Sequence, residues 1–301
     1  MGMVSSQRND SIDALRFIAA SGVVLSHALN KYDLYGYGGK LVCLFFMISG
    51  FVIFGPRKNN FSIPDFLYSR AKRIYPRYII ASLIAMLGYL AIDKRFDYVE
   101  IIRSFLLIPN LRGGIYYPIL MVGWSLCFEM LFYVKYALLS YVSHKYILPM
   151  FLVTALLLLY GNIYSAETFL YVLQFWIGGF IRRIYLSGWT GVKSGKIAIL
   201  GIIIYSIAEY MFYVNSKYSE VALCISAILI LVGCEKIQAI HKCAKLGRLY
   251  SYEIYLFHPV FMTIVFFIMP QKTIVYFPIV FVLSVILPLL FAKMMNKLGV
   301  G

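Results

Sequence analysis

The sequence predicts an all-α integral membrane protein with about ten transmembrane helices and both termini in the cytoplasm. Of its 301 residues, 61% are hydrophobic and 14% are charged, and the mean hydropathy is +0.80. Soluble domains carry about 45–50% apolar and 25% charged residues. Apolar runs of roughly 17–23 residues alternate with short charged links, as expected of helices that cross a hydrocarbon core about 30 Å thick. A transmembrane β-barrel has alternating segments of about ten residues instead, so the pattern favours helices.

The expected spans are ten apolar segments, two of which, the fifth and the eighth, are short. They are residues 12–29, 39–56, 76–92, 118–142, 146–161, 168–185, 196–213, 219–234, 248–269 and 273–292. The first is too long and too polar for a cleavable signal peptide, so we expect a retained signal anchor. The link YVEIIRSFLLIPNLRGG, after the third segment, is too short and charged to cross, and it predicts an interfacial helix followed by a loop. No repeat or linker interrupts the chain, which predicts one membrane domain over residues 1–301.

The basic residues predict the orientation. With the N-terminus inside, 18 of the 28 Lys and Arg residues fall in inner links, 8 fall in outer links, and Arg16 and Lys135 lie within spans. This positive-inside bias predicts cytoplasmic termini and a multi-pass protein of the cell's inner (plasma) membrane. Topology therefore accounts for most of the net charge of +15. The basic residues form no tail and do not alternate with aromatic residues, so we expect no nucleic-acid partner.

The cysteines predict neither a disulfide framework nor a metal site. Their spacing shows no pairing, and four of the five lie within apolar runs, where they act as packing residues. The five are Cys43, Cys127, Cys224, Cys234 and Cys243.

The first apolar segment carries three ionisable residues on one side. Arg16 and His27 are eleven residues apart, so they share a helix face about 16 Å apart along the axis, and Asp13 lies on the same side. One interpretation is structural, with Arg16 paired to Asp13 and reaching the inner headgroups while His27 caps the outer end. The other is functional, because ionisable residues inside a membrane usually face a polar interior and mark a pathway or site.

A second cluster, YSRAKRIYPRY at residues 68–78, repeats arginine at helical spacing. Arg70, Arg73 and Arg77 would lie on one face at the cytoplasmic surface. They would contact anionic lipid headgroups, or they would clamp the phosphates of a cytoplasmic nucleotide-like cofactor.

The third and fourth clusters are GWSLCFEMLFY and LGRLYSYEIYLFHPV. Ser125 and Glu129 are one turn apart, and a lone carboxylate near the middle of a membrane should be protonated or paired, with Arg16 and the histidines as candidate partners. In the later stretch Ser251, Tyr255 and His258 form one stripe, and Pro259 frees a backbone carbonyl. His258 is either a structural hydrogen-bonding group or part of a site. We expect the other two histidines, His144 and His241, to be solvated in inner loops.

Taken in order, these stretches resemble the acyltransferase-3 family of membrane O-acyltransferases, which modify cell-surface sugars. DALRFIAASGVVLSHA is similar to the family's opening helix, and YGGKLVCLFFMISGFVIF to its second helix, with Gly38 or Gly39. SRAKRIYP matches its Arg-x-x-Arg, and WSLCFEMLFY and LGRLYSYEIYLFHPV match its fourth-span and late-span signatures. The chain departs from the family in GKLVCLFF, where Cys43 stands at an often acidic position, and we expect no appended hydrolase-like domain.

The resemblance implies an acyl-CoA donor, usually acetyl-CoA, that binds from the cytoplasm, and a sugar or polysaccharide acceptor at or beyond the outer face. It implies that Arg70 and Arg73 hold the CoA phosphates and that the thioester arm passes Arg16. His27 would act as general base on the acceptor hydroxyl or as a covalent acyl relay.

The remaining candidate residues support this chemistry. Arg16 would pair with Glu129 or position the donor, and Ser125 or Tyr255 would donate to the thioester oxygen. The supporting residues are Asp13, Trp124, Ser251 and His258.

Two other membrane functions compete with this interpretation. A proton-coupled secondary transporter would use Glu129 and His27, but it predicts inverted repeats and does not need the arginine triplet. The other type of membrane O-acyltransferase, with a single His in a long apolar run, fits the paired Arg16 and His27 poorly.

Overall fold

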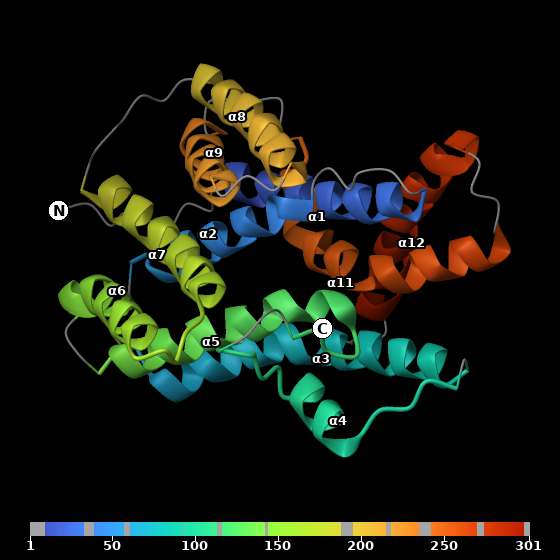
Figure 1. Ribbon diagram of the computed structural model, residues 1–301, viewed down its shortest axis with the longest axis horizontal. Coiled ribbons are helices and arrows are strands. Elements are labelled where there is room, and N and C mark those ends of the chain that lie inside the picture. Colours follow the sequence, from blue (N-terminus) through green and yellow to red (C-terminus); the bar gives the residue numbers. More distant parts are fainter. Residues whose placement is uncertain are drawn as a thin grey trace. The chain divides into compact units, whose positions relative to one another are not determined.

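The structure is a computed structural model that describes residues 10–32, 39–56, 61–91, 93–112, 116–141, 144–187, 195–214, 218–234, 242–269 and 274–297. These residues form eleven α-helices and short 3-10 turns, and none of them lies in a strand (Figure 1). The helices are α1 (Asp10–Lys31), α2 (Val42–Ile53), α3 (Ile63–Leu90), α4 (Tyr98–Phe105), α5 (Trp124–Leu139), α6 (His144–Tyr160), α7 (Ala166–Leu186), α8 (Gly195–Tyr213), α9 (Ser219–Gly233), α11 (Ala244–Ile268) and α12 (Phe277–Lys297). The all-α prediction is confirmed.

Each of the ten expected apolar segments contains a helix, and the expected interfacial helix is α4. The Asp97 side chain accepts from the backbone N–H of Glu100 at 2.7 Å, and the Glu100 side chain accepts from the Asp97 N–H at 3.2 Å. This reciprocal cap satisfies two backbone donors at the start of α4.

Among the described residues, five stretches are long and apolar enough to cross a membrane. They are Asp10–Lys31, Met121–Leu139, Gly195–Tyr213, Ala244–Ile268 and Phe277–Lys297. Three shorter apolar helices accompany them: Val42–Ile53, Lys145–Tyr160 and Ser219–Gly233. The two short spans expected at 146–161 and 219–234 are thus short helices. The number of long apolar helices is that of an integral membrane protein.

The third expected segment begins 13 residues earlier than predicted. α3 starts at Ile63, where the Ser62 side chain accepts from the Asp65 N–H at 3.4 Å and a proline occupies the first turn. The helix runs without interruption through Pro76 to Leu90. Its first turns are polar, which is why hydropathy alone placed the start too late.

The chain divides into two compact units. The first comprises residues 1–26, 35–59 and 174–252, and the second comprises residues 27–34, 60–173 and 253–301. The core of the first unit is a cluster of buried side chains from α1, α2, α7, α8 and α9, and it includes Leu15, Met47, Phe51, Tyr205 and Leu231. Cys43 and Cys234 belong to this cluster, as the packing interpretation predicted, and the five cysteines are free.

Glycines allow α2 and α7 to touch backbone to backbone in the first unit. A Cβ atom on Gly50 would lie 1.9 Å from the carbonyl oxygen of Phe175, and one on Gly178 would lie 1.9 Å from that of Met47. No side chain fits at either position. Close crossings of this kind are typical of membrane helices, where packing rather than water exclusion drives association.

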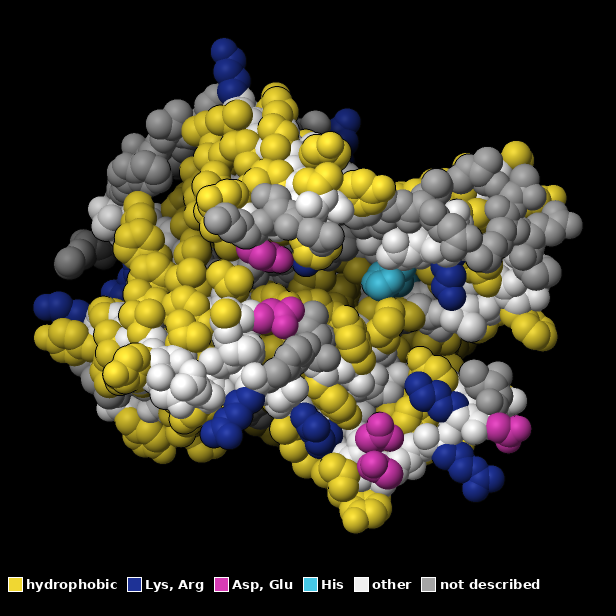
Figure 2. Space-filling model, in the orientation of Figure 1, with side chains coloured by type: hydrophobic (Ala, Val, Ile, Leu, Met, Phe, Trp, Pro, Cys, Tyr) yellow, Lys and Arg dark blue, Asp and Glu magenta, His cyan; other side chains and the backbone are white. Residues whose placement is uncertain are grey.

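The surface of α8 is apolar. Ile199, Leu200, Ile202, Ile203 and Ile207 are each about half exposed, and Figure 2 shows hydrophobic side chains over the visible part of this helix. Such a surface is expected of a helix that faces lipid.

In the second unit a buried ion pair ties three helices together. Arg77 of α3 contacts the Glu253 carboxylate of α11 at 2.8 Å and donates to the Asn296 side chain of α12 at 2.7 Å. Glu253 is 2% exposed and Arg77 is 17% exposed at the side chain. Breaking such a pair leaves an uncompensated buried charge, so each partner requires the other.

We predict that Gly50→Ala destabilises the protein and that Gly88→Ala does not. The added methyl at position 50 overlaps the Phe175 carbonyl, and overpacking costs roughly 1–3 kcal/mol. A Cβ on Gly88 would have no atom of another described side chain or helix within 4 Å, so alanine there should gain about 0.5–1 kcal/mol of helix propensity. Thermal unfolding of the purified proteins in detergent measures both. A Gly50→Ala protein that melts as high as Gly88→Ala would contradict the close crossing.

Candidate active site

The N-terminal ends of α1 and α11 are joined around Asp13 in the first unit. Asp13 accepts from Arg16 at 3.4 Å and from Arg248 at 3.2 Å, and Arg248 also contacts Asp10 at 3.0 Å. A Cβ on Gly247 would lie 1.7 Å from the Asp13 carbonyl oxygen, so the two backbones touch. The pairing of Arg16 with Asp13 is confirmed, whereas Arg248 was missed. The role of Arg16 toward a donor stays a prediction.

His27 and His258 lie side by side in the second unit. Their ring centroids are 5.2 Å apart with an angle of 38° between the planes. His258 is fully buried and His27 is partly buried. The structure therefore brings His258 next to His27, and whether His258 is structural or part of a site stays a prediction.

Two hydroxyl groups connect α5 to α11 next to this pair. The Ser125 and Tyr255 hydroxyl oxygens are 2.8 Å apart, and both can donate to the Val122 carbonyl, at 3.3 and 3.1 Å respectively. The Tyr255 ring centroid lies 6.1 Å from that of His258. Each hydroxyl carries one proton, and the carbonyl and the neighbouring hydroxyl take up both protons.

Glu129 lies one turn further along α5 and is bound by Tyr133. The Tyr133 hydroxyl donates to the Glu129 carboxylate in a short hydrogen bond. The Arg70 guanidinium lies 5.7 Å from the Tyr133 ring centroid and 5.3 Å from that of Phe66. Tyr133 was missed, although its position four residues after Glu129 is a spacing at which helical side chains meet.

The three arginines of α3 differ in their contacts. Arg77 is held in the ion pair with Glu253. Arg70 makes no hydrogen bond or ion pair with another described residue, and its buried Nε has no acceptor there. Arg73 is exposed, and together with Arg70 it interacts electrostatically with the Tyr133 hydroxyl. Arg70 and Arg73 thus remain available for a ligand.

The other supporting residues have structural contacts. The Ser251 hydroxyl donates to the Gly247 carbonyl of its own helix at 2.5 Å. The Trp124 ring packs against Tyr171, at 5.4 Å between centroids, and against Phe128, at 6.2 Å. Gly38 and His241 lie outside the described residues, as does the side chain of His144.

These contacts form one polar line in the second unit. Ser125, Glu129 and Tyr133 follow each other at four-residue spacing on α5, a distance of about 12 Å along the axis. The Arg70 guanidinium lies at one end, and the Ser125–Tyr255 pair leads to His258 and His27 at the other. The arrangement offers a cationic end, hydroxyl donors and an imidazole pair.

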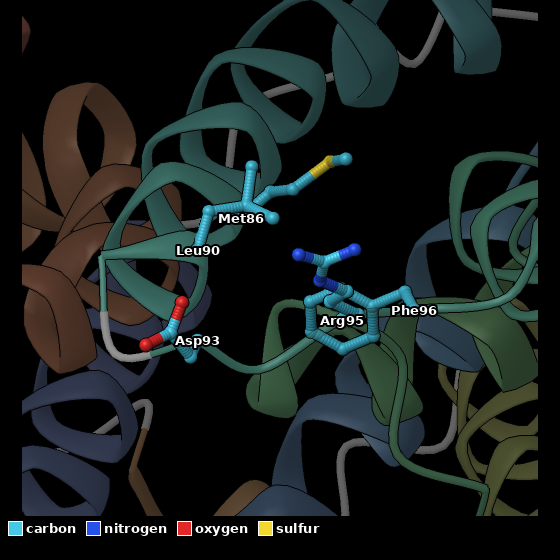
Figure 3. Close-up of a pocket in the computed structure, with 5 residues that line it drawn as sticks. All are labelled: Met86, Leu90, Asp93, Arg95 and Phe96. Carbon is cyan, nitrogen blue, oxygen red and sulfur yellow. The ribbon is translucent and has the colours of Figure 1, made fainter.

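A pocket of about 340 Å³ opens at the other end of α3. It is lined by Met86 and Leu90 of that helix and by Asp93, Arg95 and Phe96 of the following segment (Figure 3). Leu90 is 20 residues from Arg70 on the same helix, which is about 30 Å at the α-helical rise. The pocket and the arginine pair are therefore separated by about the thickness of a bilayer core.

Comparison with known proteins identifies the family. The family model described as "Acyltransferase domain" matches residues 9–293. The exopolysaccharide production protein ExoZ of Rhizobium meliloti (strain 1021) is 26% identical over 275 residues, which cover 80% of this chain and 82% of ExoZ. An O-acetyl transferase of Shigella phage Sf6 is 25% identical over 268 residues, which cover 73% of this chain and 78% of that protein. No solved structure matches.

The family match extends from the start of α1 to the last helix and includes every member of the polar line. It decides between the enzyme and the transporter in favour of the enzyme. The chain belongs to the acyltransferase-3 family and is a membrane acyltransferase.

Proposed function

We propose that this enzyme transfers an acetyl group from cytoplasmic acetyl-CoA to a hydroxyl of a cell-surface or lipid-linked sugar, with His27 as the general base. The observation that carries the proposal is the polar line from Arg70 to His27. The names of the two relatives support an acetyl donor and a polysaccharide acceptor. Lys and Arg residues are more numerous in the links predicted to be inside than in those predicted to be outside, which supports an inner-membrane protein with cytoplasmic termini.

The donor end of the line suits CoA phosphates. The rings of Phe66 and Tyr133 approach the Arg70 guanidinium, whose in-plane N–H groups have no acceptor among the described residues. A phosphate would supply acceptors for these donors in the planar geometry that guanidinium prefers. Arg73 adds a second, exposed charge beside it.

The chemistry needs a base, a leaving group and a stabilised oxyanion. His27 takes the proton of the sugar hydroxyl, and the oxygen attacks the thioester carbonyl. The C–S bond then breaks, and His27 returns the proton to the departing thiolate. Ser125 or Tyr255 stabilises the oxyanion by donating to it in place of the Val122 carbonyl, its present acceptor.

We predict that His27→Ala removes acyl esters from the surface polysaccharide. General-base catalysis contributes about 10²–10⁴-fold, so ester content should fall to background in cells that depend on this protein. Mass spectrometry of the polysaccharide and of lipid-linked glycans measures the content, and immunoblots of the membrane check expression. Asn30→Ala, an exposed change on the same helix, serves as the control. Equal ester content in wild-type and His27→Ala cells would refute the proposed function.

We predict that Arg70→Gln and Arg73→Gln each raise the KM for acetyl-CoA about tenfold with little change in kcat. A charge-assisted hydrogen bond is worth roughly 1.5–3 kcal/mol, and 1.4 kcal/mol is tenfold in affinity. Lys72→Gln is the matched control, because Lys72 is exposed on the same helix between the two arginines. Steady-state kinetics in detergent test this, and an unchanged KM in both arginine variants would refute the donor site.

A further inference from the structure

A missing backbone donor fixes the protonation of His258. In an α-helix the N–H of residue 259 would donate to the carbonyl of residue 255, but Pro259 has no N–H. The His258 Nδ1 lies 2.8 Å from the Tyr255 carbonyl oxygen and 3.2 Å from that of Ile254. A carbonyl only accepts, so Nδ1 carries the proton. In the neutral imidazole, Nε2 is then an acceptor.

This acceptor is buried and unused. The His258 side chain is fully buried, and Nε2 has no hydrogen-bond partner among the described residues. The ring of His27 lies adjacent, at 5.2 Å between centroids, and is a candidate donor to Nε2, although the structure has no hydrogen bond between the two rings. His27 makes no hydrogen bond with another described residue.

We propose that His258 is a positioning residue for His27. Its Nε2 accepts a hydrogen bond from one ring N–H of His27, which leaves the other His27 nitrogen unprotonated and directed at the acceptor hydroxyl. In a catalytic triad, the third residue holds the base in its tautomer and orientation in the same way. The inference rests on the proposed function, since it presupposes that His27 is the base.

Two substitutions of His258 separate this role from packing. His258→Phe keeps the ring volume and removes both nitrogens, whereas His258→Gln keeps a side-chain acceptor. We expect kcat to fall about 100-fold in His258→Phe and clearly less in His258→Gln, with the KM for acetyl-CoA unchanged in both. A purely structural histidine predicts the opposite order, because Phe is the better volume match.

Pro259→Ala tests the tautomer directly. Alanine supplies an N–H that competes with Nδ1 of His258 for the Tyr255 carbonyl. We expect kcat to fall about tenfold in the wild-type background and no further in His258→Phe. Thermal unfolding of each variant checks that the fold persists.

The outcomes distinguish this inference from the proposed function. If His27→Ala is inactive while His258→Phe is fully active, the positioning role of His258 is wrong, and the proposed role of His27 as general base is unaffected. An equal effect of Pro259→Ala in both backgrounds also overturns it. If His27→Ala keeps full activity, the proposed function fails and the positioning role fails with it.

A separate observation, the pocket at the end of α3, points to the acceptor. Asp93 and Arg95 both line it, and neither makes an ion pair in the part of the chain that the structure describes. The Lys94 ammonium lies 4.5 Å from the Tyr89 ring centroid and 5.3 Å from that of Phe96, so it packs against the Phe96 ring that lines the pocket. The pocket therefore combines an acceptor, a donor and an apolar ring around one opening (Figure 3).

The geometry points to a glycan subsite. A hydroxyl both donates and accepts, so a sugar can satisfy the Asp93 carboxylate and the Arg95 guanidinium at once, with its apolar face on Phe96. An anionic lipid headgroup prefers cations alone, and Asp93 would repel it. The separation of about 30 Å from Arg70 puts the pocket on the side opposite the donor, as the proposed function requires.

Asp93→Asn and Arg95→Gln test the subsite. With de-O-acylated surface polysaccharide as acceptor, we expect each to raise the acceptor KM about tenfold and to leave the KM for acetyl-CoA unchanged. Arg112→Gln, at another exposed arginine, is the control. An unchanged acceptor KM overturns the subsite, and so does weaker binding to anionic vesicles with normal acceptor kinetics. If the wild-type protein acylates no polysaccharide, the proposed function fails and the subsite fails with it.

Discussion

Polar groups on helices that are surrounded by apolar side chains or lipid must find partners inside the protein, because no water is there to replace them. This constraint governs both units. In the first, Asp13 holds Arg16 and Arg248 and thereby joins the ends of α1 and α11. In the second, Arg77 and Glu253 join α3 to α11. Each of these pairs specifies which helix packs against which neighbour. Apolar helix surfaces are similar to one another and specify the neighbour less well.

Close packing supplies the rest of the association. Gly50 and Gly178 bring α2 and α7 into backbone contact, and Gly247 does the same for α11 against Asp13. Where the helices touch so closely, a polar side chain beside the crossing is held in one position. The Asp13 carboxylate is an example, since the backbone contact at Gly247 places it against Arg248.

Local features of this structure could be predicted from the sequence, whereas partners from distant segments could not. The helical segments follow from hydropathy, and the pairing of Asp13 with Arg16 follows from three-residue spacing. The same rule would have found Tyr133 for Glu129. Nothing local distinguishes Arg70 from Arg77, which share a helix face, because the difference is made by Glu253 on another helix. His27 and His258 likewise meet only through folding, so their proximity was not predictable from either motif.

Several buried side chains have a hydrogen-bonding atom without a partner among the described residues. Their surroundings show which of them are compensated by neighbouring aromatic rings and which are not. The Lys135 ammonium is buried without a hydrogen bond, but it lies 4.5 Å from the Phe151 ring centroid and 5.6 Å from that of Tyr164. Ring faces compensate an ammonium, which is a point charge, so Lys135 is explained by its aromatic neighbours. Arg70 also lies over rings, yet a planar guanidinium keeps in-plane donors that rings do not satisfy. His258 has no such compensation for its Nε2, because a lone pair gains nothing from an aromatic face. Arg70 and His258 therefore keep hydrogen-bonding capacity at the two ends of the polar line, where we propose a CoA phosphate and the His27 N–H as their partners.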